Sequence, residues 1–120
     1  MKSHKDLELW KKSVELVKTI YEITKSFPKE ELYGLTNQIR RSAVSIPSNI
    51  AEGAARNHNR EFIQFLYIAL GSIAELETRI IISEKLLFLS RNTSEKIQNE
   101  LVELKNMSLG LIKYLKNKNL

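Results

Sequence analysis

The segment over residues 60–88 carries apolar residues at spacings of three and four, which constrains the fold more than any other feature of the sequence. The repeat comprises Phe62, Leu66, Ala69, Ile73, Leu76, Ile80, Ser83 and Leu87. This spacing matches the 3.6-residue period of an α-helix and differs from the alternation of a half-buried strand. A helix of about 28 residues is roughly 42 Å long, so we expect an elongated molecule.

Three other segments repeat with the same period, and nothing in the chain reads as a strand. The first of these stripes consists of Leu7, Trp10, Val14, Val17, Tyr21 and Thr24. We expect helices over about 6–25, 35–55, 60–88 and 93–116, joined by connections too short to cross a bundle. The sequence therefore predicts one all-α domain over residues 1–120, an antiparallel up-down-up-down four-helix bundle.

The long third helix has a second apolar row, displaced by one position from the first. This row comprises Ile63, Tyr67, Leu70, Ala74 and Ile81. A helix that is apolar on two sides is buried on two sides, whereas an isolated four-helix bundle leaves one side of each helix in water. We favour an oligomer interface formed with another copy of the chain. The alternative is a broad core stripe within one copy.

Polar residues form a seam at helical spacing in the second helix. The seam comprises Gln38, Ser42, Ser45, Asn49, Glu52 and Arg56, and its counterpart in the third helix comprises Glu61, Phe65, Ile68, Ser72, Glu75 and Arg79. In antiparallel helices one residue number rises as the facing one falls, so the two numbers of every facing pair add up to the same value. Ser45 with Ser72 and Gln38 with Arg79 are two pairs that meet this condition. We expect the two seams to pack closely in this register.

Small and charged side chains define the expected contacts along the seam. Ser45, Gly71 and Ser72 are the small residues expected to let the two backbones approach. A buried carboxylate without a partner costs several kcal/mol, about 3–5 by analogy with broken buried pairs. We therefore expect Arg41 to reach Glu75, and Arg56 to pair with Glu61 at the loop end.

Pro47 lies in the middle of the second expected helix. It cannot donate a hydrogen bond to the carbonyl of Ala43, and an internal proline costs about 3 kcal/mol, so we expect a kink. Asn49 or a water molecule is expected to supply the missing donor. On this interpretation the polar residues of the seam are present because the kink needs them. We favour it over the alternative that Ser45, Asn49 and Glu52 bind a ligand.

The sequence offers little for catalysis. It has no cysteine, and its two histidines, His4 and His58, have no ligands at helical spacing. No Glu-x-x-His motif of di-iron bundles and no glycine-rich phosphate loop is present. We expect a non-enzyme without metal or cofactor. No run approaches about 18 uncharged apolar residues, so we expect no membrane contact and a cytoplasmic location.

The net charge of +5 leaves binding to RNA or another nucleic acid open. The candidate contacts are Arg40, Arg41, Arg56, Arg60, Lys11 and Lys12, with the tail at Lys116–Asn119. Arg40 is expected to face outward. The alternative is a solvated basic surface, and because base-reading aromatic motifs are absent, any binding should follow shape and backbone charge.

Two strings of the sequence carry a resemblance to a known family. "SIPSNIAEG" at 45–53 and "GSIAELET" at 71–78 lie within a match from Asp6 to Leu89, while the fourth helix is similar only in pattern. The chain resembles the bacterial four-helix-bundle proteins encoded in intervening sequences of 23S rRNA genes, and their free-standing homologues. Where members often begin the third helix with serine or threonine, this chain has His58, so Asn57 or Asn59 is expected to cap it.

The resemblance implies a ring of usually five copies, a homopentamer, which agrees with the two apolar rows. The chain is more distantly similar to accessory proteins of retroelements, which bind a reverse transcriptase and nucleic acid. We therefore expect an oligomeric binding or scaffold protein with RNA affinity. The alternatives are a reverse-transcriptase accessory factor and, less favoured, a small-molecule enzyme.

Overall fold

The computed structural model describes residues 3–118 and contains helices and no strand within that range. The helices are α1 (Glu8–Thr24), α2 (Leu35–Ala54), α3 (Asn59–Lys85) and α4 (Arg91–Lys118). Short 3₁₀ turns at His4–Asp6 and Lys29–Glu31 precede α1 and α2. The prediction of an all-α chain with four helices is confirmed.

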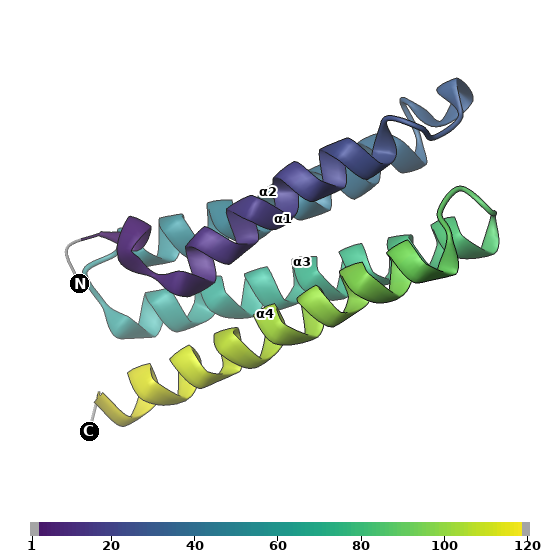
Figure 1. Cartoon of the computed structure of the whole chain (residues 1–120). Coiled ribbons are helices and arrows are strands. Elements are labelled where there is room, and N and C mark those ends of the chain that lie inside the picture. The colour runs from purple at the N-terminus through teal and green to yellow at the C-terminus, as the bar shows by residue number, and fades with distance from the viewer. Residues whose placement is uncertain (1–2, 119–120) are drawn as a thin grey trace.

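The helices lie side by side as an elongated bundle (Figure 1). The α1–α2 and α3–α4 connections lie at one end, and the α2–α3 connection lies at the other, so consecutive helices run in opposite directions. The extents of 49 × 22 × 19 Å match the elongated shape expected from the length of α3. Each helix packs against two neighbours, and α1 and α4 make the sparsest contact of these pairs.

The apolar stripe predicted for the first helix matches the observed core only in part, because Leu7, Trp10 and Val17 pack at its edge and Thr24 is buried. Val14 and Tyr21 are exposed, whereas the buried residues of α1 are Leu9, Ser13, Leu16, Ile20 and Thr24. The cause is Ser13, which holds a core position. Its hydroxyl donates to the Trp10 carbonyl at 2.8 Å, so it can be buried without losing a hydrogen bond.

Buried serines bonded to their own helix recur in α3 and α4, and the stripe predicted for the third helix matches the observed core from Phe62 to Ser83. Ser83 donates to the Arg79 carbonyl and Ser108 to the Leu104 carbonyl, each at 2.8 Å. Around them the core is filled by large aliphatic side chains that are almost fully buried. Examples are Ile39, Ile46, Ile50, Leu66, Leu76, Ile80, Ile97 and Leu101. Burial of this apolar area is the main stabilising term of the bundle.

The starts of α3 and α4 differ from the predictions. The fourth helix begins at Arg91, and the Ser90 hydroxyl accepts from the Thr93 backbone N–H at 3.1 Å, so Ser90 caps it. The predicted start at residue 93 is therefore wrong by two residues. At the start of α3, His58 holds the N-cap position without a side-chain hydrogen bond to the helix, so the predicted capping by Asn57 or Asn59 is also wrong.

The end of α3 is closed by an unusual residue. Leu87 has φ of 66°, in the left-handed region, where glycine is normally found. The Leu87 N–H donates to the Glu84 carbonyl and the Phe88 N–H to the Ser83 carbonyl, each at 2.9 Å, which is the Schellman pattern. A leucine in this conformation costs about 1–2 kcal/mol relative to a relaxed backbone. Leu87 therefore leaves the core, although the stripe of the third helix predicted it there.

Candidate interaction surfaces

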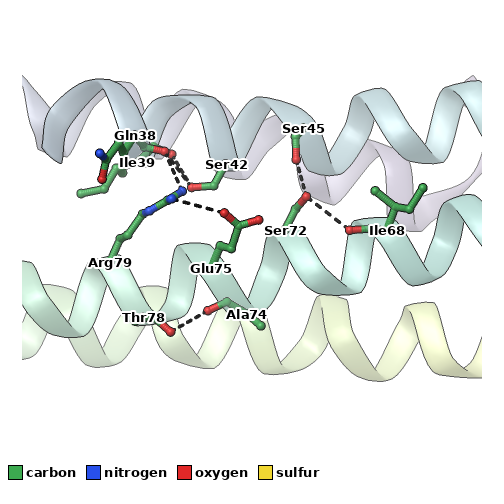
Figure 2. A network of polar contacts seen from close by, with 10 residues as sticks. All are labelled: Gln38, Ile39, Ser42, Ser45, Ile68, Ser72, Ala74, Glu75, Thr78 and Arg79. Atoms are coloured by element: carbon green, nitrogen blue, oxygen red, sulfur yellow. Dashed lines mark hydrogen bonds and ion pairs between the residues drawn. The ribbon is translucent and has the colours of Figure 1, made fainter. Parts of the chain in front are cut away.

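The polar seam between α2 and α3 forms in the predicted register (Figure 2). The Ser45 hydroxyl donates to the Ser72 hydroxyl, which in turn donates to the Ile68 carbonyl at 3.3 Å. Further along, Arg79 Nη1 donates to the Gln38 carbonyl at 3.2 Å. Because both pairs share the predicted sum of residue numbers, the antiparallel register is confirmed.

The predicted ion pair between Arg41 and Glu75 is wrong. Glu75 pairs instead with Arg79, one turn away on the same helix, at 3.2 Å (Figure 2). The carboxylate is more than half exposed, so no buried charge forces a cross-helix partner, and the i,i+4 geometry within α3 is the nearer choice. Arg41 is left exposed at the edge of a polar groove. That groove is lined by Gln38, Arg41, Ser42, Ser45, Glu75 and Arg79.

The ion pair predicted at the loop end is also wrong. Arg56, in the bend after α2, contacts Glu52 in the last turn of α2 at 3.5 Å, and its guanidinium lies 5.0 Å from the centre of the Phe65 ring of α3. The carboxylate partner of Arg56 is therefore Glu52 and not the predicted Glu61. Surface pairs one turn apart contribute only about 0.3–0.5 kcal/mol.

Asn49 does not supply the donor that Pro47 removes. Its side-chain amide donates to the Ser45 carbonyl at 2.8 Å, and not to the Ala43 carbonyl as expected. The α2 helix continues through Pro47, which is buried. The kink itself stays a prediction. Because the hydroxyls of Ser45 and Ser72 are engaged between the helices, the contacts support a structural use of the seam over ligand binding.

The close approach of α2 and α3 depends on a glycine that the sequence interpretation missed. A Cβ added to Gly53 would lie 2.7 Å from Phe65 Cβ and 3.0 Å from Phe62 Cδ1. By contrast, a Cβ on Gly71 would meet nothing within 4 Å, so the role predicted for Gly71 is wrong. The register offered the missing signal, because it places Gly53 opposite the segment between Phe62 and Phe65.

Arg40, predicted to face outward, is bound to α1. Its Nε donates to the Thr24 hydroxyl at 2.9 Å and its Nη2 to the Tyr21 carbonyl at 3.5 Å, while the guanidinium lies 4.6 Å from the centre of the Tyr21 ring. The positive charge therefore sits at the C-terminus of α1, where unpaired carbonyls favour a cation. The outward role is wrong, and the contact instead ties α2 to α1.

The two candidate lysines of α1 are paired with carboxylates. Lys11 contacts Glu8 at 3.4 Å, and Lys12 hydrogen-bonds to Glu103 of α4. The hydrogen bond and the negative charge of Glu103 raise the pKa of Lys12 above its ordinary value of 10.5. These partners reduce the charge that α1 offers to a phosphate.

The predicted basic tail is likewise engaged in part. Lys116 donates to the Tyr67 hydroxyl at 3.1 Å, and Lys118 lies 5.6 Å from the centre of the Tyr114 ring. Asn119 lies outside the described residues. Of the six basic residues named for nucleic-acid binding, Arg41 and Arg60 are exposed and make no ion pair within residues 3–118.

The second apolar row of α3 is divided between core and surface. Ile63 and Leu70 are half-buried and pack against the core, as the broad-stripe alternative expects, and Ile81 is half-buried. Tyr67 and Ala74 are exposed. A groove between α3 and α4 continues this surface; aliphatic residues make up most of its lining, together with Glu77, Lys105 and Asn106. We name the apolar surface formed by Tyr67, Leu70, Ala74, Val102 and Leu109 the α3–α4 flank.

Within the described residues, no group of three or more histidine, cysteine, aspartate or glutamate side chains is arranged to hold a metal ion. No helix in the same range is long and apolar enough to cross a membrane. Neither finding points to a site beyond the seam, the basic residues and the flank.

Comparisons with known proteins agree on one family. A family model described as 23S rRNA-intervening sequence protein matches residues 5–110. A crystal structure of a protein of unknown function from the S23 ribosomal protein family of Bacteroides thetaiotaomicron superposes with a TM-score of 0.81 and 27% identity. The match covers 88% of this chain and 98% of that one. No curated protein matches the sequence.

Proposed function

The chain belongs to the family of 23S rRNA-intervening sequence proteins, and from this premise we propose that it is a non-enzymatic scaffold that assembles from copies of itself. The α3–α4 flank is the observation that carries the proposal. Tyr67 is 47% exposed and Val102 equally so, and Val102 lines a groove that also contains the buried residues Ile73 and Leu101. An exposed apolar surface of this kind is typical of a protein interface. Five copies, the number implied by the resemblance, is the assembly that we propose.

The flank can be tested without disturbing the core. Ala74 is exposed and its side chain is small, so Ala74→Glu adds a charge to the flank with little change in packing. We expect this variant to lose the five-copy assembly in sedimentation velocity and to sediment as a particle of at most two chains of 13.9 kDa. Gln64→Glu adds the same charge to an exposed position of α3 outside the flank and is the matched control. A wild-type protein of one copy at all concentrations would refute the proposal.

RNA is the second function that we propose, as a ligand of the assembled protein. Arg41 and Arg60 support it, because both guanidiniums are exposed and unpaired within the described range. Two arginines in one copy bind phosphates weakly, but a ring repeats them and raises the effective concentration of sites. Arg40 and the paired lysines are not part of this proposal.

Filter binding of ribosomal RNA over a range of salt tests the second proposal. We expect Arg41→Gln with Arg60→Gln to weaken binding and to lower the salt dependence by about one unit of slope for each phosphate that is no longer neutralised. Lys11→Gln with Lys12→Gln removes the same charge from lysines that already have carboxylate partners, and is expected to change binding less. If both double variants lost the same affinity, net charge alone would explain the binding, and Arg41 and Arg60 would have no specific role in it. No interaction of the described residues favours a reverse transcriptase, so we do not propose one as partner.

A further inference from the structure

The α1–α2 and α3–α4 connections lie at the same end of the bundle (Figure 1), and both contain large apolar residues that are exposed. Tyr33 in the first connection is 92% exposed and Leu87 in the second is 89% exposed, the two highest values among the large hydrophobic residues described. Leu32 and Leu86 are about half exposed beside them. We name these four residues the loop-end surface.

The two connections are held together as one unit. Phe27, at the end of α1, and Phe88, after α3, place their ring centres 5.6 Å apart, and Phe27 is buried. Offset and tilted ring contacts at this separation are favourable. Both connections therefore lie at one end of the bundle and are tied to each other by the aromatic contact.

Leu87 indicates that this exposure has a use. Its backbone is in the left-handed conformation that glycine adopts without strain, and glycine would close the same turn. The leucine side chain contributes little to the stability of the folded chain, because it is almost fully exposed to water. A strained position whose side chain faces outward points to a contact outside the molecule.

The charges around the loop-end surface identify the kind of partner. Lys29 and Glu30 flank it in the first connection, and Glu84 and Lys85, the last two residues of α3, precede the second connection. None of the four forms an ion pair within residues 3–118. Each pair is neutral, and the neighbouring Glu31 adds one negative charge, so the surface does not attract a phosphate backbone or an anionic lipid.

A second copy of the chain fits this pattern. A two-fold axis at the end of the bundle sets the first connection of one copy against the second connection of the other. Lys29 then faces Glu84 and Glu30 faces Lys85, while the apolar residues meet between them. We propose that two copies pair end to end through the loop-end surface. This contact is separate from the α3–α4 flank and joins whatever assemblies the flank forms.

The decisive variant is Leu87→Gly, because it removes the apolar contact while relieving backbone strain. We expect it to unfold at a higher denaturant concentration than the wild type and yet to pair more than about tenfold more weakly, as for a central residue of an interface. Tyr33→Ser is expected to weaken pairing similarly. Leu87→Gly that keeps wild-type pairing would overturn the proposal, and misfolding cannot explain a loss of pairing in a stabilised variant.

The Ala74→Glu background separates this proposal from that of the flank. With the flank disabled, native mass spectrometry should show a two-copy particle, which Leu87→Gly then converts to one copy. A single copy in Ala74→Glu alone would refute end-to-end pairing while leaving the flank intact as an interface.

Charge exchange tests the geometry of the pair. Glu30→Lys should weaken pairing, and adding Lys85→Glu should restore it, because the two positions face each other across the axis. Failure of the second change to restore pairing would refute the two-fold arrangement. Sedimentation with neutral phosphatidylcholine vesicles tests whether the loop-end surface binds lipid instead. Vesicle binding that disappears in Leu87→Gly, together with the absence of a two-copy particle, would overturn the pairing proposal and assign the surface to lipid.

Discussion

The α2–α3 pair and the α1–α4 pair hold the same bundle together by different means. Between α2 and α3, Gly53 lies against two phenylalanines, and Ser45 bonds to Ser72 across the interface. Between α1 and α4, an open groove contains charged side chains, and the exposed pair of Lys12 with Glu103 bridges the two helices. Small residues let one pair approach closely, whereas the other pair is joined at its edge. We therefore expect changes in the first pair to cost more.

The largest effect is expected at Gly53. Overpacking a close contact costs about 1–3 kcal/mol, and the backbone must shift because the nearest atom is Phe65 Cβ. The gain in helix propensity of up to about 1 kcal/mol offsets part of this cost. We expect Gly53→Ala to lower the free energy of unfolding by about 2 kcal/mol or less, measured by urea denaturation.

Gly71→Ala is the matched control for that experiment. It makes the same substitution in a neighbouring helix where no atom lies within 4 Å of the new Cβ. We expect it to stabilise the protein by about 0.5–1 kcal/mol. If both variants were equally stable, the α2–α3 pair would not be more closely packed than an open helix face.

A double-mutant cycle at Ser45 and Ser72 measures the polar part of the difference. Each alanine removes one hydroxyl and leaves the other without its cross-helix partner, so we expect a coupling of about 1 kcal/mol. Urea denaturation of the wild type, the two single variants and the double variant provides the four values. Ser13→Ala is the control outside the interface, since its hydroxyl bonds to its own helix. A coupling near zero would mean that the apolar contacts alone set the register.

The smallest effect is expected at Lys12 and Glu103. The carboxylate raises the pKa of Lys12 above 10.5, so the pair stabilises the folded chain fully below that pH and loses its effect as the pH rises past it. Thermal unfolding should show a slightly larger alkaline loss of stability for the wild type than for Lys12→Met. Lys18→Met, at an exposed lysine with no ion pair in the described range, is the control. A loss of stability as large as that of Gly53→Ala would remove the distinction between the two pairs.

The register of α2 and α3 was accessible from the sequence because both helices carry polar residues at helical spacing on the facing line. The phase of α1 was not, because Ser13 occupies a core position that a stripe of apolar letters cannot reveal. Ion pairs were missed for a different reason. Arg79 pairs with a carboxylate one turn away on α3, and Arg56, just after α2, pairs with a carboxylate four residues earlier in the chain. Spacing along two helices does not decide between such a partner and one across the interface.

A surface formed by two helices could not be predicted from the spacing within either helix alone. The second row of α3 was visible in the sequence, but Val102 and Leu109 of α4 extend it only once the helices are placed side by side. The same holds for Arg40, whose spacing suggested solvent and whose actual neighbours, Tyr21 and Thr24, belong to the preceding helix.

The hydroxyl contact between Ser45 and Ser72 prevents α2 from sliding along α3. Most buried serines of the bundle bond to carbonyls of their own helix and would tolerate a displacement along the axis. A shift of α2 by one turn, about 5.4 Å, would bring aliphatic side chains against other aliphatic side chains. The shifted helix would, however, separate these two serines and press larger residues toward the aromatic rings at Gly53. The Ser45–Ser72 contact and Gly53, which has no side chain, thus fix the position of α2 along the axis of α3.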